Sequence, residues 1–252
     1  MGIDVSATKE VQFNGTHQKL VDTSVTNNPR RHVLNLDAAA QLSVQSIFRR
    51  RNSSDKQDKR DGNPLIYALK RTNGYTITLD EMMRFRPSFQ GILERAMNQA
   101  NYDAIVPMPS SHPIALMLAK RAARYQLGLE VWTGFLAKRT TTEAAQDLSA
   151  MLAARQFPKE LVAEVRALIA TWAATPNAPL ALKHVGAKLR PYIKPLKLAG
   201  PPPRKNLSIL LVDDLLATGT TLKTAADILI ASGCAASVDG LCLLSPKGRP
   251  RH

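Results

Sequence analysis

The sequence predicts an α/β fold, in which helices flank a twisted, mainly parallel sheet. Two observations indicate this class. Short apolar runs alternate along the chain with segments of helical periodicity, and the runs are apolar throughout, as in strands covered on both faces. The chain of 252 residues is also 44% hydrophobic, so it can bury the core of one large domain or of two small ones.

The N-terminal segment has the weakest pattern. Residues 1–32 are polar and aperiodic, and we interpret residues 1–62 as a mobile or partner-ordered extension. Within it, residues 33–48 are predicted to form a short helix. The stretch 49–62 is charged and contains no apolar residue, so it is predicted to be a solvated loop.

The next segment leads toward the sheet. Residues 64–70 are predicted to form a strand, and residues 75–79 alternate apolar and polar side chains as a half-buried strand does. Asp80 is predicted to cap a helix that ends near Ala100, with a break or kink at Pro87.

From residue 104 onward, strands and helices alternate. Pro158 suits a helix start, and Gly233 suits a helix end. The predicted strands are 104–106, 129–132, 207–212 and 238–244, and the predicted helices are 113–125, 222–232 and two or three within 143–190.

The most informative segment joins the strand at 207–212 to the helix that follows it. Asp213 and Asp214 stand at the carboxyl end of the strand, where open α/β sheets bind ligands. Small or hydroxylated residues, Ala217 to Thr221, lead into the helix and expose backbone N–H groups that suit a phosphate monoester. The two acids can accept hydrogen bonds from vicinal ribose hydroxyls. The alternative is a purely structural strand–turn–helix, in which Asp caps the turn and Thr caps the helix.

This string closely resembles the phosphoribosyl-pyrophosphate (PRPP) motif of type I phosphoribosyltransferases. The part from Asp213 to Gly219 is most similar to the adenine phosphoribosyltransferase version. The rest of the chain is more similar to the competence-protein-F branch, through Tyr67-Ala68-Leu69-Lys70, residues 103–109 and residues 136–149.

The resemblance implies a type I phosphoribosyltransferase fold over residues 63–252, with a hood and a helical insertion at about 143–200. It implies an Mg²⁺-dependent transferase that displaces pyrophosphate from PRPP with a nitrogen acceptor. Asp213 and Asp214 would bind the ribose hydroxyls, directly or through Mg²⁺. The residues that would wrap the 5′-phosphate are Ala217, Thr218, Gly219, Thr220 and Thr221.

The same resemblance implies a pyrophosphate loop and a closing loop. The pyrophosphate loop would comprise Pro109, Ser110, Ser111 and His112. The two serines can equally cap the helix at 113–125, and His112 can equally be a surface histidine. Lys138 and Arg139 would lie on a flexible loop that closes over the site, or they form a solvated pair.

The charge of the chain indicates an anionic partner. Lys and Arg number 34 against 20 Asp and Glu, which gives a net charge of +14. The basic segments 49–51, 183–205 and 247–252 favour DNA or RNA, although such runs are also found on solvated faces. A non-catalytic PRPP-fold protein that regulates or binds nucleic acid is therefore the alternative function.

The two functions can be combined. Phosphoribosyltransferase-like proteins serve as effectors beside reverse transcriptase and structured nucleic acid in bacterial retron defence systems, and this basic, extended chain resembles that setting. It would then act within an oligomer or a protein complex.

Composition predicts a cytoplasmic location. No apolar run approaches the roughly 20 residues of a membrane span, and the first 30 residues lack the apolar centre of a secretory signal. Cys234 and Cys242 cannot build a disulfide framework. We therefore expect no membrane partner.

Overall fold

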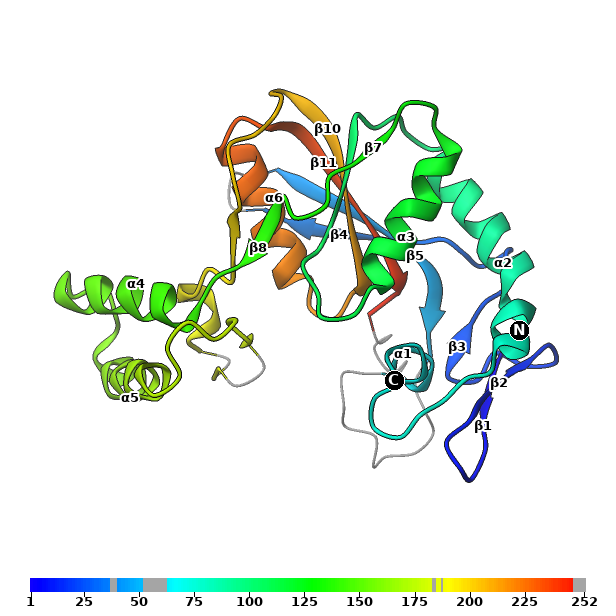
Figure 1. The fold of residues 1–252 in the computed structure, drawn as a ribbon, viewed down its shortest axis with the longest axis horizontal. Helices are drawn as coiled ribbons and strands as arrows, with labels where there is room; N and C mark the ends of the chain where they lie inside the picture. The colour runs from blue at the N-terminus through cyan, green and yellow to red at the C-terminus, as the bar shows by residue number, and fades with distance from the viewer. Residues whose placement is uncertain (37–39, 52–62, 183–184, 187, 247–252) are drawn as a thin grey trace. The chain divides into compact units, whose positions relative to one another are not determined.

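The protein, described by a computed structural model, consists of two compact units (Figure 1). Unit 1 comprises residues 1–133 and 202–252, and unit 2 comprises residues 134–201. The structure describes residues 1–36, 40–51, 63–182, 185–186 and 188–246.

A seven-stranded mixed sheet forms the centre of unit 1. Its strands are β3 (Val21–Asp22), β4 (Arg30–Asn35), β5 (Gln41–Arg50), β6 (Ala104–Pro107), β7 (Glu130–Val131), β10 (Leu207–Leu215) and β11 (Ala235–Leu244). Their order is β3-β5-β11-β10-β6-β7, with β4 also paired to β5. The strands from β5 to β7 in this order run parallel, whereas β3 and β4 run antiparallel to β5. An α/β class with mostly parallel strands is therefore confirmed.

Helices flank this sheet, and a hairpin precedes it. The helices of unit 1 are α1 (Pro64–Lys70), α2 (Leu79–Met97), α3 (Ile114–Ala122) and α6 (Thr220–Ala231), and the hairpin is β1 (Gly2–Val5) with β2 (Val11–Asn14). The strands and helices predicted after residue 104 are thus confirmed in unit 1.

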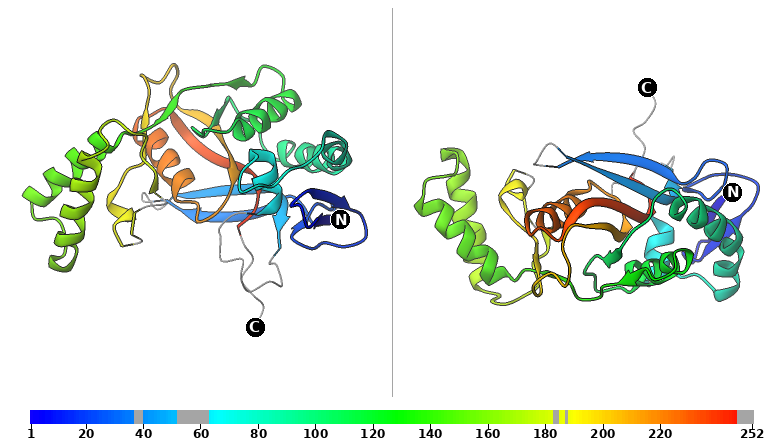
Figure 2. Two further views of the ribbon diagram at one scale, coloured as in Figure 1. Left: turned by 60° about the horizontal axis from the view of Figure 1, so that its bottom comes forward. Right: turned by 90° about the horizontal axis from the view of Figure 1, so that it is seen from above.

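Two crossover connections diverge from neighbouring strands. β6 leads through α3 to β7 on one side, and β10 leads through α6 to β11 on the other. Because such connections are right-handed, α3 and α6 must cover opposite faces. Figures 1 and 2 show α6 on one side of β10 and β11, and α2 with α3 on the other. The strand order therefore reverses between β6 and β10.

The face that carries α1, α2 and α3 closes over an apolar core. Leu210 and Val212 of β10 pack there with Leu65 of α1, Ile92 of α2 and Leu118 of α3. Each of these five side chains is at most 3% exposed. This core fixes α1 against the sheet near the carboxyl end of β10.

The first 50 residues differ from the predicted mobile or partner-ordered extension over 1–62. They form β1 to β5, and β5 lies within the sheet beside β11. The helix predicted for 33–48 is wrong. Leu42, Val44 and Ser46 are buried at every second position, which is the period of a strand. The remainder, 52–62, lies outside the described residues.

The strand predicted for 64–70 is also wrong, because these residues form α1. The Asn63 side chain accepts a hydrogen bond from the Leu65 N–H at 2.9 Å, and Pro64 occupies the first helical turn. Both features stabilise a helix start. A short apolar run fits a buried strand and a buried helix equally well, so the helix-start residues Asn63 and Pro64 decide that this run forms a helix.

Helix α2 begins slightly earlier than the sequence indicates and ends at Met97, close to the predicted end. Thr78 caps it in place of Asp80, since the Thr78 hydroxyl accepts from the Glu81 N–H at 3.2 Å. The strand predicted just before it is reduced to a bridge at Thr76. The helix continues through Pro87 without a break. Phe85 and Ile92 are buried on either side of the proline, so packing of both halves outweighs the lost backbone hydrogen bond.

Unit 2 has a helical core of its own. Helices α4 (Thr141–Ala153) and α5 (Val162–Ala173) pack together through Leu148, Val165 and Trp172. Strands β8 (Leu136–Lys138) and β9 (Leu196–Leu198) form a separate antiparallel pair. These helices lie where the sequence indicates two or three helices within 143–190.

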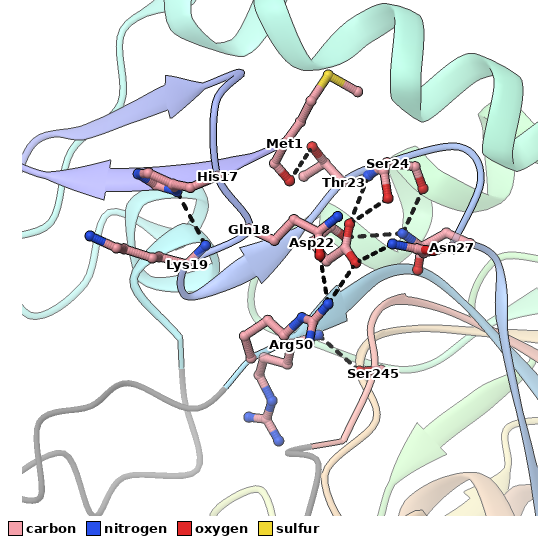
Figure 3. A network of polar contacts seen from close by, with 12 residues as sticks. Met1, His17, Gln18, Lys19, Asp22, Thr23, Ser24, Asn27, Arg50 and Ser245 are labelled. Carbon is pink, nitrogen blue, oxygen red and sulfur yellow. Dashed lines mark hydrogen bonds and ion pairs between the residues drawn. The ribbon is translucent and has the colours of Figure 1, made fainter.

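A buried carboxylate organises the N-terminal strands of unit 1 (Figure 3). Asp22 is fully buried and accepts hydrogen bonds from Ser24, Asn27 and Arg51 at 2.6–3.2 Å. Burial alone would raise the pKa of Asp22, but these hydrogen bonds outweigh it and hold the pKa below its usual range. The charged form of Asp22 therefore stabilises the fold.

Replacing Asp22 with Asn is expected to lower the free energy of unfolding by about 2 kcal/mol at pH 7. Because the folded pKa lies below the unfolded value, the contribution of Asp22 is present above about pH 4 and is lost as the pH falls through the folded pKa. Urea unfolding of the wild type and of Asp22→Asn, at pH 7 and at lower pH, measures this contribution. The prediction is wrong if the difference in free energy of unfolding between the two proteins does not become smaller as the pH falls.

Candidate functional site

The carboxyl ends of β6 and β10 meet at one edge of the sheet. Val212 of β10 pairs with Pro107 of β6, and the Met108 N–H donates to the Val212 carbonyl at 2.8 Å. The loop after β6 leads to α3 and the turn after β10 leads to α6, on opposite faces. Open α/β sheets bind ligands at points where neighbouring connections diverge in this way.

Asp213 and Asp214 stand at this edge but have different surroundings. Side chains alternate along a strand, so Asp214 projects to the same face as Val212, and Asp213 projects to the opposite face. Asp214 is 7% exposed and forms an ion pair with Lys70 of α1. The Asp214 N–H donates to the Asp213 carboxylate at 2.8 Å, and Asp213 is half-buried. The two acids are neighbours in the chain and their side chains lie on opposite faces of the strand, and their part in binding ribose or metal stays a prediction.

A buried thiol lies next to the two acids. Cys242 of β11 pairs directly with Asp213 and is fully buried. Burial raises the pKa of the Cys242 thiol well above its usual value, and the nearby Asp213 and Asp214 charges raise it further. The neutral thiol form of Cys242 is therefore favoured.

The turn after β10 leaves the start of α6 open. Gly219 is the residue that precedes α6, and no side chain caps the helix. The Thr218 and Thr220 hydroxyls instead pair with each other at 3.0 Å, and Ala217, Thr218 and Thr221 are exposed. The alternative in which Thr caps this helix is thus not realised. The first N–H groups of α6 carry positive potential and are oriented as in an anion site.

Gly219 adopts a conformation that glycine favours, with φ of +80°. A Cβ atom at this position would overlap Cδ1 of Leu34 and lie 3.0 Å from its Cδ2. Leu34 belongs to β4, so the N-terminal hairpin of β4 and β5 packs against the turn. The sequence does not indicate this contact, because nothing in it relates residue 34 to residue 219.

The loop after β6 contains the four predicted pyrophosphate-loop residues, Pro109 to His112. Ser110 accepts a hydrogen bond from the His112 N–H at 3.2 Å, and both Ser110 and Ser111 are exposed. Helix α3 follows Pro113 without a side-chain cap. The serines therefore do not cap α3, and their part in binding diphosphate stays a prediction.

Lys138 and Arg139 belong to unit 2 and differ from the predicted flexible loop. Lys138 ends β8, and the Arg139 backbone continues the pairing by donating to the Pro195 carbonyl at 3.0 Å. The Arg139 guanidinium binds Asp147, which raises the pKa of Arg139. Lys138 is exposed. Their contribution to catalysis stays a prediction.

Lys70 is the site residue that sequence reasoning did not assign. Its ammonium reaches Asp214 from the last turn of α1, and its side chain is 21% exposed. A signal was present in the sequence, since Tyr67-Ala68-Leu69-Lys70 is one of the strings that resemble the competence-protein-F branch. With residues 64–70 predicted as a strand, nothing indicated toward which residue Lys70 points. In helix α1 its side chain points to Asp214.

The magnesium site predicted at Asp213 and Asp214 stays a prediction. Among the residues that the structure describes, no cluster of three or more His, Cys, Asp or Glu side chains forms a metal site. Mg²⁺ commonly takes only one or two carboxylates and completes its shell with phosphate oxygens and water. Asp213 and Asp214 supply that number of carboxylates.

The first basic segment differs from the solvated run that the sequence indicates. Arg50 is 3% exposed, and its N–H donates to the Ser245 hydroxyl at 2.9 Å. Arg51 is half-buried and binds Asp22. Arg49–Arg51 are thus part of the folded sheet edge.

The other basic segments are partly engaged in ion pairs. Within 183–205, Lys197 pairs with Glu143, and Arg204 pairs with Glu130 at 3.1 Å. The lysines of this segment that are exposed are Lys188, Lys194 and Lys205. Lys183 and the tail 247–252 lie outside the described residues.

None of the described helices combines the length and the apolar surface that crossing a bilayer requires. In comparisons with known proteins, the chain matches no protein-family model and no curated protein.

Proposed function

We propose that the protein is an Mg²⁺-dependent phosphoribosyltransferase of the type I fold, which uses PRPP and a nitrogen acceptor. The observation that carries the proposal is the position of Asp213, Asp214 and the uncapped turn 217–221 beside β6, where the strand order reverses. Ligands of open α/β sheets bind at such points. The resemblance of the same residues to the PRPP motif supports this choice of ligand.

The 5′-phosphate, the ribose and the diphosphate of PRPP each suit a different group of residues at the carboxyl edge of the sheet. The 5′-phosphate suits the N–H groups at the start of α6 and the hydroxyls of Thr218 and Thr220. The ribose hydroxyls suit the carboxylates of Asp213 and Asp214. The diphosphate then extends toward Ser110 and the rest of the loop after β6, on the neighbouring strand.

The reaction is a displacement at C1 of the ribose. The lone pair of the acceptor nitrogen forms the bond to C1 while the bond from C1 to the diphosphate oxygen breaks, and its electron pair leaves with pyrophosphate. The acceptor nitrogen loses its proton to pyrophosphate or water. Positive charge develops on the ribose and negative charge on the leaving group. Carboxylates beside the ribose and N–H or ammonium donors beside the diphosphate stabilise both charges.

Asp213 and Asp214 would hold the Mg²⁺ together with substrate oxygens. A bound Mg²⁺ would neutralise part of the negative charge of the diphosphate. The residues of the chain orient the ribose and phosphate and hold C1 in line with the acceptor. This displacement needs no covalent nucleophile.

Release of pyrophosphate from PRPP tests the proposal. The protein is incubated with Mg²⁺, PRPP and a panel of purine and pyrimidine bases, nucleotides and proteins, and pyrophosphate is measured. We expect release with at least one acceptor, and a rate at least about 100-fold higher than that of Asp213→Ala/Asp214→Ala. Circular dichroism checks that the double variant is folded.

Two outcomes contradict catalysis. If the wild type releases no more pyrophosphate than the double variant with any acceptor, the transferase proposal fails. If it nevertheless binds PRPP, the non-catalytic alternative, in which the PRPP site regulates the protein or its binding of nucleic acid, replaces it.

A further inference from the structure

The ion pair between Lys70 and Asp214 connects α1 to the proposed PRPP site. α1 is fixed at both ends: Asn63 caps its start, and Arg71 ends it in the left-handed region with an N–H that donates to the Ala68 carbonyl at 3.1 Å. Leu65, at 2% exposure, anchors it in the core. The base of the Lys70 side chain is therefore held in place while its flexible stem can still move.

Lys70 lies on the face that the diphosphate would meet. Asp214 projects to the same face as α1 and α3, and the loop after β6 leads to α3 on that face. The ammonium of Lys70 is thus directed to the carboxyl edge of β10, next to the strand that carries residues 109–112.

The loop after β6 and the turn after β10 carry no cation of their own, and the next one along the chain is Lys223 in α6. Residues 109–113 and 213–222 contain neither Lys nor Arg. Serine hydroxyls and backbone N–H groups are neutral donors, whereas pyrophosphate leaves with several negative charges. An ammonium group at this edge offsets charge that neutral donors do not.

We propose that Lys70 binds the diphosphate of PRPP and stabilises it as the leaving group. This rests on the proposed transferase function. In the free protein Asp214 holds the ammonium at the edge, and in the complex Lys70 shares its three N–H donors between Asp214 and the diphosphate oxygens. Lys70 is then a substrate-binding residue and not only a structural partner of Asp214.

The test compares two ligands on variants of the full chain. Lys70→Met removes the charge and keeps a long side chain, and Lys70→Arg restores a cation. Lys120→Met is the matched control, because Lys120 is exposed on α3. Calorimetry measures the binding of inorganic pyrophosphate with Mg²⁺, and separately of ribose 5-phosphate, which has no diphosphate.

We expect Lys70→Met to weaken pyrophosphate binding at least tenfold and ribose 5-phosphate binding less than threefold. Lys70→Arg should recover most of the loss, and Lys120→Met should bind both ligands as the wild type does. If Lys70→Met binds pyrophosphate as tightly as the wild type, or loses both ligands equally, the role of Lys70 is structural and the inference is overturned.

Failure of the underlying function gives a different result. A wild type that binds neither PRPP nor ribose 5-phosphate removes the proposed function, and the inference with it. A wild type that binds PRPP while Lys70→Met binds it equally well removes only the inference.

Discussion

Replacing Gly219 with Ala is expected to destabilise unit 1 and to weaken the binding of ribose 5-phosphate at least tenfold. Two costs arise. A side chain at φ of +80° costs about 1–2 kcal/mol, because Cβ meets the backbone. The Cβ would also overlap the end of the Leu34 side chain, so either Leu34 or the turn must move, which costs up to about 1–3 kcal/mol. Where the turn moves, the N–H groups at the proposed phosphate site move with it.

A second glycine separates the two costs. Gly233, just after α6, also has a positive φ, at +71°, but a Cβ there would meet nothing within 4 Å. Gly233→Ala therefore measures the backbone cost alone. Urea unfolding of both variants gives the cost of the overlap as the difference, and calorimetry with ribose 5-phosphate gives the effect on the site.

A third variant also removes the Leu34 side chain, with which the new Cβ overlaps. Leu34→Ala/Gly219→Ala should recover the stability that the overlap with Leu34 costs, but not the stability that the positive φ costs. It also keeps the test usable if Gly219→Ala alone does not fold. A Gly219→Ala protein as stable as Gly233→Ala would show that β4 does not press on the turn.

The sequence predicted the strands and helices after residue 104 because each carries a local signal. β10 is apolar from Ile209 to Val212, and the string from Asp213 to Thr221 has a composition that turns with anion sites share. This local pattern placed the two acids at the end of the strand and an open turn before α6, and the ligand of that turn stays a prediction. These features depend on residues close together in the chain.

The sequence did not predict the features that depend on distant residues. β5 alternates polar and apolar residues only from Gln41 to Gln45, and this short signal lies within the segment predicted as a helix; pairing with β11 on one side and β4 on the other makes it a strand. The contact of Leu34 with Gly219 and the pairing of Lys70 with Asp214 join segments more than a hundred residues apart. Local periodicity contains no information about such pairs.

Asp213→Asn and Asp214→Asn are expected to reduce pyrophosphate release to a similar extent but to differ in their effect on stability. Either change removes a carboxylate from the ribose and metal, and we expect a loss of about 100-fold or more in turnover. Asparagine at 213 can still accept the hydrogen bond from the Asp214 N–H, so Asp213→Asn should cost less stability than Asp214→Asn.

Asparagine at 214 leaves the Lys70 ammonium without its anion. Lys70 is only 21% exposed, so the unpaired charge should cost about 1–3 kcal/mol, less than in a fully buried pair because Lys70 keeps some contact with water. Unfolding by urea and a pyrophosphate-release assay on the same preparations measure both effects. Equal stability of the two variants would contradict the placement of Asp214 on the α1 face.

Adding Lys70→Met to Asp214→Asn distinguishes charge from packing. Once the pair is removed as a whole, no unpaired ammonium remains, and the double variant should be more stable than Asp214→Asn alone. Turnover should not return, because the carboxylate is still missing. Stability that recovers without activity would mean that Asp214 has two separable roles: it holds Lys70 in the free protein, and it holds the substrate during the reaction.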